Sequence, residues 1–128
     1  MPTTRIDSLD DERVRMYRNL RDADLARSNT HFIAEGRFIV ERLLASDCEV
    51  ESVLVAERQA EKIAPLLPDD VPMYVADDAR HRAIVGFDFH RGVLACGRRP
   101  ATPTLDSLLE RATSDPSRPL TLVICPET

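Results

Sequence analysis

The chain has 128 residues, of which 43% are hydrophobic, so it is long enough for one domain with a sizeable core. Its net charge of −5 and its pI near 5.2 give no overall basic signal for nucleic acid, which argues against RNA or DNA binding by the chain as a whole. No apolar run approaches the ~18 residues of a membrane span, and the charged N-terminus lacks the apolar region of a signal peptide. We therefore expect a cytoplasmic protein without a membrane segment.

The cysteines and arginines indicate which kinds of binding site and which redox compartment to expect. Cys48, Cys96 and Cys125 are odd in number and far apart, which favours small buried side chains in a reducing compartment over a disulfide framework or a zinc site. No metal site is expected. Lys62 is the single lysine among 17 basic residues. Such an excess of arginine suits the recognition of phosphates, although the composition of a GC-rich genome is the simpler explanation.

Residues 1–7 are expected to form a disordered lead-in, followed by a helix with Ser8 as its N-cap. Residues 21–29 continue the charged pattern as a second short helix or a turn. Strands and helices then alternate, which predicts an α/β domain with helices on both faces of the sheet. The strands are expected at 31–36, 49–56, 71–76 and 91–97, and the helices between them at 37–46, 57–67 and 77–86.

Local signals refine these helices and the end of the domain. Pro65 is expected to end or distort the second helix, and Asp77 and Gly86 to cap the third. The core domain is expected to span residues 30–98, after an N-terminal helical extension over 1–29. A proline-rich linker with a helix covers 99–118, and the apolar run within 119–128 predicts a final strand that opens another unit.

One segment, RHRAIVGFDFHRGVLACGRR, carries five arginines against a single acid in a chain that is acidic overall. Positive charge is therefore concentrated here, which fits a binding surface and fits equally well arginines that simply face solvent on a loop. Gly92 permits a close approach of a backbone or a ligand. The neighbouring His90 and Arg91 suit a phosphate or a stacked base, but a lone histidine is more often structural.

A second segment, FIAEGRF, places Glu35 at the end of a strand, Gly36 in a tight turn and Arg37 at the start of a helix. Such a turn brings helix N–H groups toward an anion. A single glycine is far short of a phosphate-binding loop, so a structural role for Glu35 and Gly36 is favoured, with Glu35 capping the helix or pairing with an arginine. No catalytic triad, nucleophile elbow, carboxylate pair or metal set is present, so we expect no catalytic residue in the chain.

The segments YRNL, FIAEGRFIVERLLAS, VESVLVAE, VPMYVAD, IVGFDFHRGVLACGRRP and LTLVICPET resemble, in this order, the N-terminal part of SpoU-class (TrmH-like) RNA 2′-O-methyltransferases. The resemblance covers residues 13–128. It implies a three-layer α/β/α sandwich with a small mixed sheet, similar to kink-turn-binding ribosomal proteins. It also implies that 119–128 is the first strand of a SPOUT domain, whose trefoil knot binds S-adenosylmethionine and forms a homodimer. The catalytic and cofactor motifs of that domain would lie beyond Thr128.

On this resemblance the chain is the substrate-recognition domain of a methyltransferase that modifies rRNA or tRNA, and it neither catalyses nor holds a cofactor by itself. The residues expected to face RNA are Arg37, His90, Arg91, Arg98 and Arg99, with Glu35, Gly36 and Gly92 as structural turn residues. The alternative is a protein-interaction or dimerisation module without an RNA role. The net charge of −5 and the glutamates between Glu49 and Glu61 favour that alternative.

Overall fold

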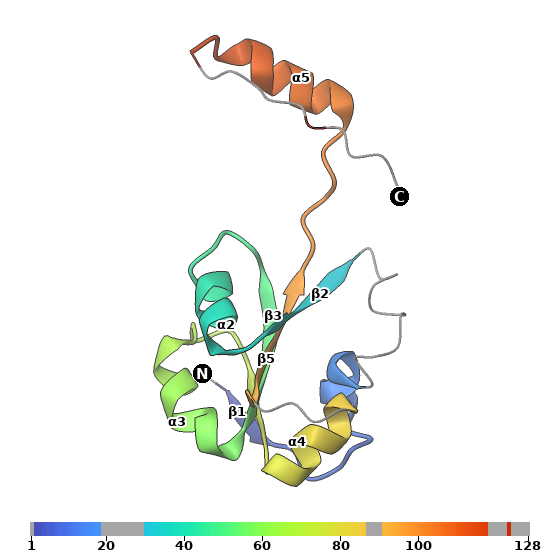
Figure 1. Cartoon of the computed structure of the whole chain (residues 1–128), viewed down its shortest axis with the longest axis vertical. Helices are drawn as coiled ribbons and strands as arrows, with labels where there is room; N and C mark the ends of the chain where they lie inside the picture. Colours follow the sequence, from blue (N-terminus) through green and yellow to red (C-terminus); the bar gives the residue numbers. More distant parts are fainter. Residues whose placement is uncertain (1, 19–29, 87–90, 118–122, 124–128) are drawn as a thin grey trace.

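The computed structural model describes residues 2–18, 30–86, 91–117 and 123. A five-stranded sheet lies at its centre, in the order β1-β4-β3-β5-β2 (Figure 1). β1, β4 and β3 run parallel, whereas β5 is antiparallel to both of its neighbours, so the expected mixed sheet is confirmed. The strands are β1 (Thr3–Arg5), β2 (His31–Glu35), β3 (Val50–Ala56), β4 (Met73–Ala76) and β5 (Val93–Arg98).

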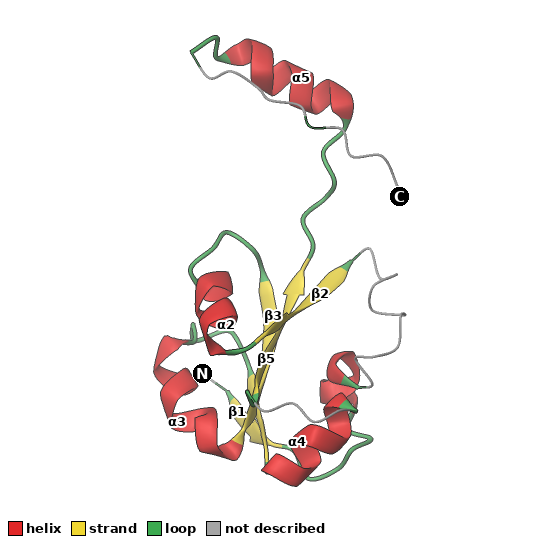
Figure 2. Ribbon diagram, in the orientation of Figure 1, coloured by secondary structure: helices red, strands yellow, loops and turns green. Residues whose placement is uncertain are grey.

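Helices cover both faces of this sheet, which confirms the three layers (Figure 2). One face carries α2 (Arg37–Leu44) and α3 (Ala60–Ile63), the latter flanked by the short 3-10 helices η2 (Glu57–Gln59) and η3 (Ala64–Leu66). The other face carries the 3-10 helix η1 (Glu12–Tyr17) and α4 (Asp78–Val85).

The central strands supply both hydrophobic cores because their side chains alternate between the two faces. Along β3, Val53 and Val55 pack under α2 and α3, whereas Leu54 packs under η1 and α4. Along β5, Ala95 faces the first core, and Leu94 and Cys96 face the second. All of these side chains are fully buried, so β3 and β5 form the rigid centre of the fold.

The N-terminus differs from the sequence-based expectation. Residues 2–7 are not a disordered lead-in, since β1 pairs in parallel with β4 and Ile6 is 1% exposed. The following helix is a single 3-10 segment capped by Asp11 rather than Ser8, because the Asp11 side chain accepts a hydrogen bond from the backbone N–H of Arg13. The sheet therefore starts well before residue 30. A strand as short as β1 has too few residues to show a hydrophobic period.

Several local expectations are confirmed. The helix that contains Pro65 is broken, since α3 ends at Ile63 and continues as 3-10. Asp77 caps α4 by accepting from the backbone N–H of Arg80 (2.8 Å), and Gly86 ends it in the left-handed conformation. On α2, Val40 is buried, whereas Ile39 is 47% exposed.

The C-terminal part lies away from the sheet. The expected helix is present as α5 (Leu105–Ser114), capped by Thr104, and it stands apart from the layered domain (Figure 1). None of its residues is buried. The strand expected within 119–128 falls outside the described residues except for Val123, which is 74% exposed, and the short helix or turn expected over 21–29 also falls outside them. In the described part of the chain, no helix has the length and apolar character to span a membrane.

Candidate nucleic-acid interface

Four strands end at the same edge of the sheet, and β5 begins there. β1, β3 and β4 run in parallel, and β2 runs in the same direction because both β2 and β3 are antiparallel to β5. We call this edge, with residues 35–37, 57–59, 77–78 and 91–92, the carboxyl edge. In open α/β sheets, ligands bind outside the carboxyl ends of the strands. Two of the predicted segments, around Gly36 and Gly92, therefore meet where the fold favours binding.

The turn at Gly36 and the side chain of Arg91 lie directly against each other. Gly36 has a φ of +92°, and its backbone N–H donates to the carbonyl of Val93 (2.9 Å). A Cβ at Gly36 would lie 3.0 Å from Cδ and 3.1 Å from Nη1 of Arg91. The turn therefore requires glycine for its conformation and for the close approach of the arginine. No side chain caps α2, so Glu35 does not play the capping role considered for it.

Gly92 brings a further arginine to the same edge. Its φ is +65°, and a Cβ there would lie 2.9 Å from Cβ of Ala56 and 3.1 Å from Nη2 of Arg58. Arg58 Nε in turn donates to Asp78 (2.9 Å), and Gln59 donates to the carbonyl of Arg91 (3.3 Å). The sequence analysis did not single out Arg58. Its position two residues after the end of β3 was the available signal.

The arginines of this edge differ in how far their charge is compensated. Arg37 forms an ion pair with Glu41 one helical turn later (2.6 Å), and Arg58 pairs with Asp78. Arg91 is exposed, and no ion pair among the described residues involves it. Arg91 is therefore the guanidinium most available to an anion at this edge. His90, expected beside it, falls outside the described residues.

The other two expected arginines lie at the opposite end of the sheet. Arg91 precedes β5 and Arg98 is its last residue, so the extended strand separates them by roughly 20 Å. Arg98 pairs with Glu51 (2.5 Å) and Glu49 (3.6 Å). Arg99 donates from Nε to the carbonyl of His31 (3.1 Å). The expected RNA-facing residues thus divide into two groups, and the charge of Arg98 is largely compensated within the domain.

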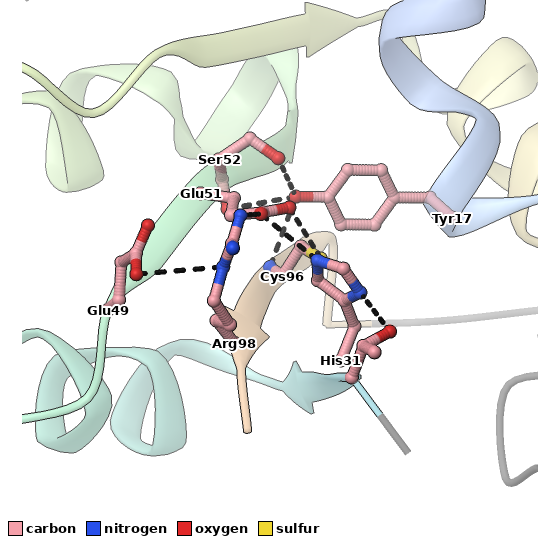
Figure 3. Close-up of polar contacts among 8 residues, drawn as sticks. Tyr17, His31, Glu49, Glu51, Ser52, Cys96 and Arg98 are labelled. Carbon is pink, nitrogen blue, oxygen red and sulfur yellow. Dashed lines mark hydrogen bonds and ion pairs between the residues drawn. The ribbon is translucent and has the colours of Figure 1, made fainter. Parts of the chain in front are cut away.

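Figure 3 shows a polar cluster at this second end that the sequence analysis missed. The register of β3 against β5 shifts between Val50 and Ser52, which places Glu51 in a bulge. Glu51 accepts from His31 Nε2 (3.0 Å) and from Arg98. Burial raises the pKa of Glu51, but the hydrogen bonds from His31 and Arg98 outweigh this effect and hold it below its ordinary value. The bulge therefore stabilises an ionised carboxylate between two basic side chains.

A buried tyrosine completes the arrangement beside the bulge. Tyr17 contacts Ser52 through its hydroxyl, which lies 2.9 Å from the Ser52 carbonyl and 2.7 Å from Ser52 Oγ, and accepts from the backbone N–H of Cys96 (3.2 Å; Figure 3). Burial raises the pKa of the Cys96 thiol to about 11, so it supplies no thiolate nucleophile near neutral pH. Among the described residues, no group of three or more His, Cys, Asp or Glu side chains has an arrangement that would hold a metal ion.

The sequence is similar to that of two curated mycobacterial proteins, although no protein-family model matches it. It is 32% identical over 108 residues to an uncharacterized tRNA/rRNA methyltransferase of Mycobacterium bovis, and equally to one of Mycobacterium tuberculosis. Each match covers 80% of this chain and 38% of the relative. The chain thus spans about two fifths of the length of the curated relatives that it matches.

Solved structures show the same relationship at the level of the fold. An rRNA methyltransferase from Sinorhizobium meliloti, solved with bound AdoMet, matches with a TM-score of 0.61 at 18% identity, over 79% of this chain and 38% of that one. An RNA 2′-O ribose methyltransferase matches with a TM-score of 0.58 at 23% identity, over 78% and 39%. The predicted relationship is confirmed: the chain is similar in sequence to one part of proteins named tRNA/rRNA methyltransferases, and it shares its fold with part of solved RNA methyltransferases.

Proposed function

We propose that this chain is the RNA substrate-recognition domain of a SpoU-class ribose 2′-O-methyltransferase acting on rRNA or tRNA. The observation that carries the proposal is the 32% identity to the mycobacterial proteins named tRNA/rRNA methyltransferases. The fold shared with solved RNA methyltransferases supports it. Because the match spans only part of those proteins, the reaction itself belongs to the proposal for the whole protein and not to these residues.

The carboxyl edge is the surface that we assign to RNA. The exposed guanidinium of Arg91 crosses the Gly36 turn, and Arg37 and Arg58 flank it. Guanidinium groups match phosphates bidentately, and phosphate contacts position a folded RNA without reading its sequence. RNA of double-helical form is recognised mostly by shape, which suits a domain that positions a ribose held elsewhere. The acidic remainder of the chain limits binding to this basic surface.

The described residues do not fit the methyl donor S-adenosylmethionine. An open pocket of about 430 Å³ lies along the linker, lined by residues 99–103. Its charged side chain is Arg99, a cation that would repel the sulfonium of the donor. We therefore assign the cofactor to none of the described residues and derive no step through it. A homodimer built by the catalytic domain, and a location in the cytoplasm where these RNAs are processed, are parts of the proposal for the full protein.

The test is a binding titration of the chain against total rRNA and tRNA over a salt series. Arg91→Ala is expected to weaken binding and to lower the slope of log K against log[salt] by about 0.7–0.9, the contribution of one phosphate contact. Arg111→Ala, which removes an exposed arginine from α5, is the matched control and is expected to leave the slope unchanged. Absence of binding at low ionic strength, or binding without salt dependence, would contradict the proposal.

A further inference from the structure

We infer that two copies of this chain associate through β2, whose outer edge pairs antiparallel with β2 of a second copy and joins the two sheets into one. β2 is the last strand of the sheet, and within the described ranges only β5 pairs with it. An unpaired edge presents a row of N–H and C=O groups that template pairing with another strand. The inference does not depend on RNA binding, because the pairing uses the backbone of residues 31–35, whereas the RNA surface consists of the side chains of Arg37, Arg58 and Arg91.

The hydrogen bonds of β2 identify the groups that face outward. The Thr30 carbonyl accepts from the backbone N–H of Arg99 (2.8 Å), and the Gly36 N–H donates to Val93 (2.9 Å). In an antiparallel pair, alternate residues turn their backbone groups toward the partner strand. Residues 30, 32, 34 and 36 therefore face β5, and His31, Ile33 and Glu35 face outward. The hydrogen bond from Arg99 Nε to the carbonyl of His31 agrees with this assignment, because that carbonyl is bonded to a side chain and not to the backbone of β5.

The sequence of β2, HFIAE, is complementary to itself in the antiparallel direction. With a two-fold axis at Ile33, each outward N–H meets an outward C=O of the second copy. His31 then lies opposite Glu35, and Phe32 lies opposite the small Ala34. A large side chain opposite a small one favours close packing between the two strands. A shift by one residue would place the backbone groups that face β5 opposite those that face outward. A shift by two residues would leave Glu35 or His31 without a partner in the second strand, so this register is the one that uses the whole strand.

The side chains at this edge leave room for such a neighbour. Glu35 is exposed, and none of the ion pairs among the described residues involves it. The helix α2 packs over β2 and β5, and its Phe38 (76% exposed) and Ile39 (47% exposed) have little cover. Because paired strands lie about 4.8 Å apart, joining two copies at β2 brings the two α2 helices next to each other on one face. Apolar surface then adds to the backbone pairing.

Arg99 is the side chain that opposes this association. Its guanidinium occupies the outward carbonyl of His31, which the N–H of Glu35 from the second copy would otherwise use. Charged side chains at an edge are a common means of limiting strand-to-strand association. We therefore expect weak pairing in the wild-type chain and stronger pairing in Arg99→Ala.

The test is sedimentation equilibrium of the 128-residue chain without RNA, over roughly 10 µM to 1 mM, the range of weak association. The expected result is a concentration-dependent rise in mass from 14.4 kDa toward twice that value, at least five-fold tighter in Arg99→Ala. Ile33→Pro removes an outward N–H at the two-fold axis and is tolerated on an edge strand, so it is expected to weaken association at least ten-fold, with Ile33→Val as its control. Glu35→Lys is expected to weaken association as well, and it decides the matter if Ile33→Pro fails to fold by circular dichroism.

Two outcomes would overturn the inference. One is a mass of 14.4 kDa at every concentration for both the wild-type chain and Arg99→Ala. The other is association that Ile33→Pro and Glu35→Lys leave unchanged, in particular association that Arg91→Ala abolishes, which would place the interface at the carboxyl edge. RNA binding in the salt titration is read separately, so failure of the pairing and failure of the proposed function are distinguishable.

Discussion

The hydroxyl of Tyr17 is expected to contribute about 2 kcal/mol to the stability of the fold, and Tyr17→Phe removes it without creating a cavity. Tyr17 is fully buried, and its hydroxyl contacts Ser52 and accepts from the N–H of Cys96 where the bulge interrupts the ladder between β3 and β5. Phenylalanine fills the same space but offers no acceptor. Leaving a buried N–H unsatisfied costs about 1–3 kcal/mol. The loss is therefore expected near the middle of that range.

The assay is urea unfolding of both chains, read as the free energy of unfolding at an unchanged m-value. Tyr74→Phe is the matched control, because Tyr74 is half-buried on β4 and none of the described hydrogen bonds involves its hydroxyl. A second variant, Ser52→Ala, tests whether the two groups act together, since non-additive losses are expected for residues in direct contact. A loss below about 0.5 kcal/mol in Tyr17→Phe would refute the reasoning, because the hydroxyl would then not be needed to satisfy the Cys96 N–H.

Three further substitutions test other parts of the domain. Gly97→Ala places a Cβ within 2.8 Å of Cε1 of Phe32 and is expected to cost about 1–3 kcal/mol in urea unfolding, with Phe32→Ala restoring room in the double variant. Burial lowers the pKa of His81 to about 4, so between pH 6.5 and 4 only the unfolded chain binds a proton at this residue. The free energy of unfolding is therefore expected to fall by up to ~1.4 kcal/mol per pH unit as the pH drops from 6.5 toward 4, and His81→Phe is expected to abolish that slope. Asp77→Ala removes the cap of α4 and is expected to cost about 1 kcal/mol near neutral pH. Because the hydrogen bond from the Arg80 N–H lowers the pKa of Asp77, the difference should shrink in acid, where the carboxyl is protonated in both states.

The sequence predicts best those strands, caps and turns whose signal lies in neighbouring residues. Its β-branched residues predict β3, a short apolar run predicts β5, and the capping roles of Asp77 and Gly86 follow from neighbouring residues alone. Gly36 and Gly92 were also predicted as turn residues, and both have positive φ angles. The strand β1 was missed because its place in the sheet depends on pairing with β4, nearly seventy residues later, and not on its own short sequence.

The candidate site was predicted only in part, because it too depends on pairing between strands that are distant in the sequence. The segments around Gly36 and Gly92 were both singled out, but their contact depends on the antiparallel pairing of β2 with β5, which no local pattern specifies. Arg98 was expected to face RNA, yet the bulge in β3 turns Glu51 toward it. The charge that a sequence segment leaves uncompensated depends on partners from other strands: Arg98 pairs with Glu49 and Glu51, whereas no ion pair among the described residues involves Arg91.

The strand β5 sets the distance between the Arg91 turn and the point where the chain leaves the sheet. The strand is paired on both sides, begins beside Arg91 and ends where the chain leaves the sheet toward α5. Anything joined through α5 is therefore held away from the Arg91 turn by the full length of β5, roughly 20 Å, and the connector adds to that separation. Under the proposed function, an RNA phosphate bound at the Arg91 turn would lie at least this far from a reacting group joined through α5, and we would expect a longer β5 to change which nucleotide is reached.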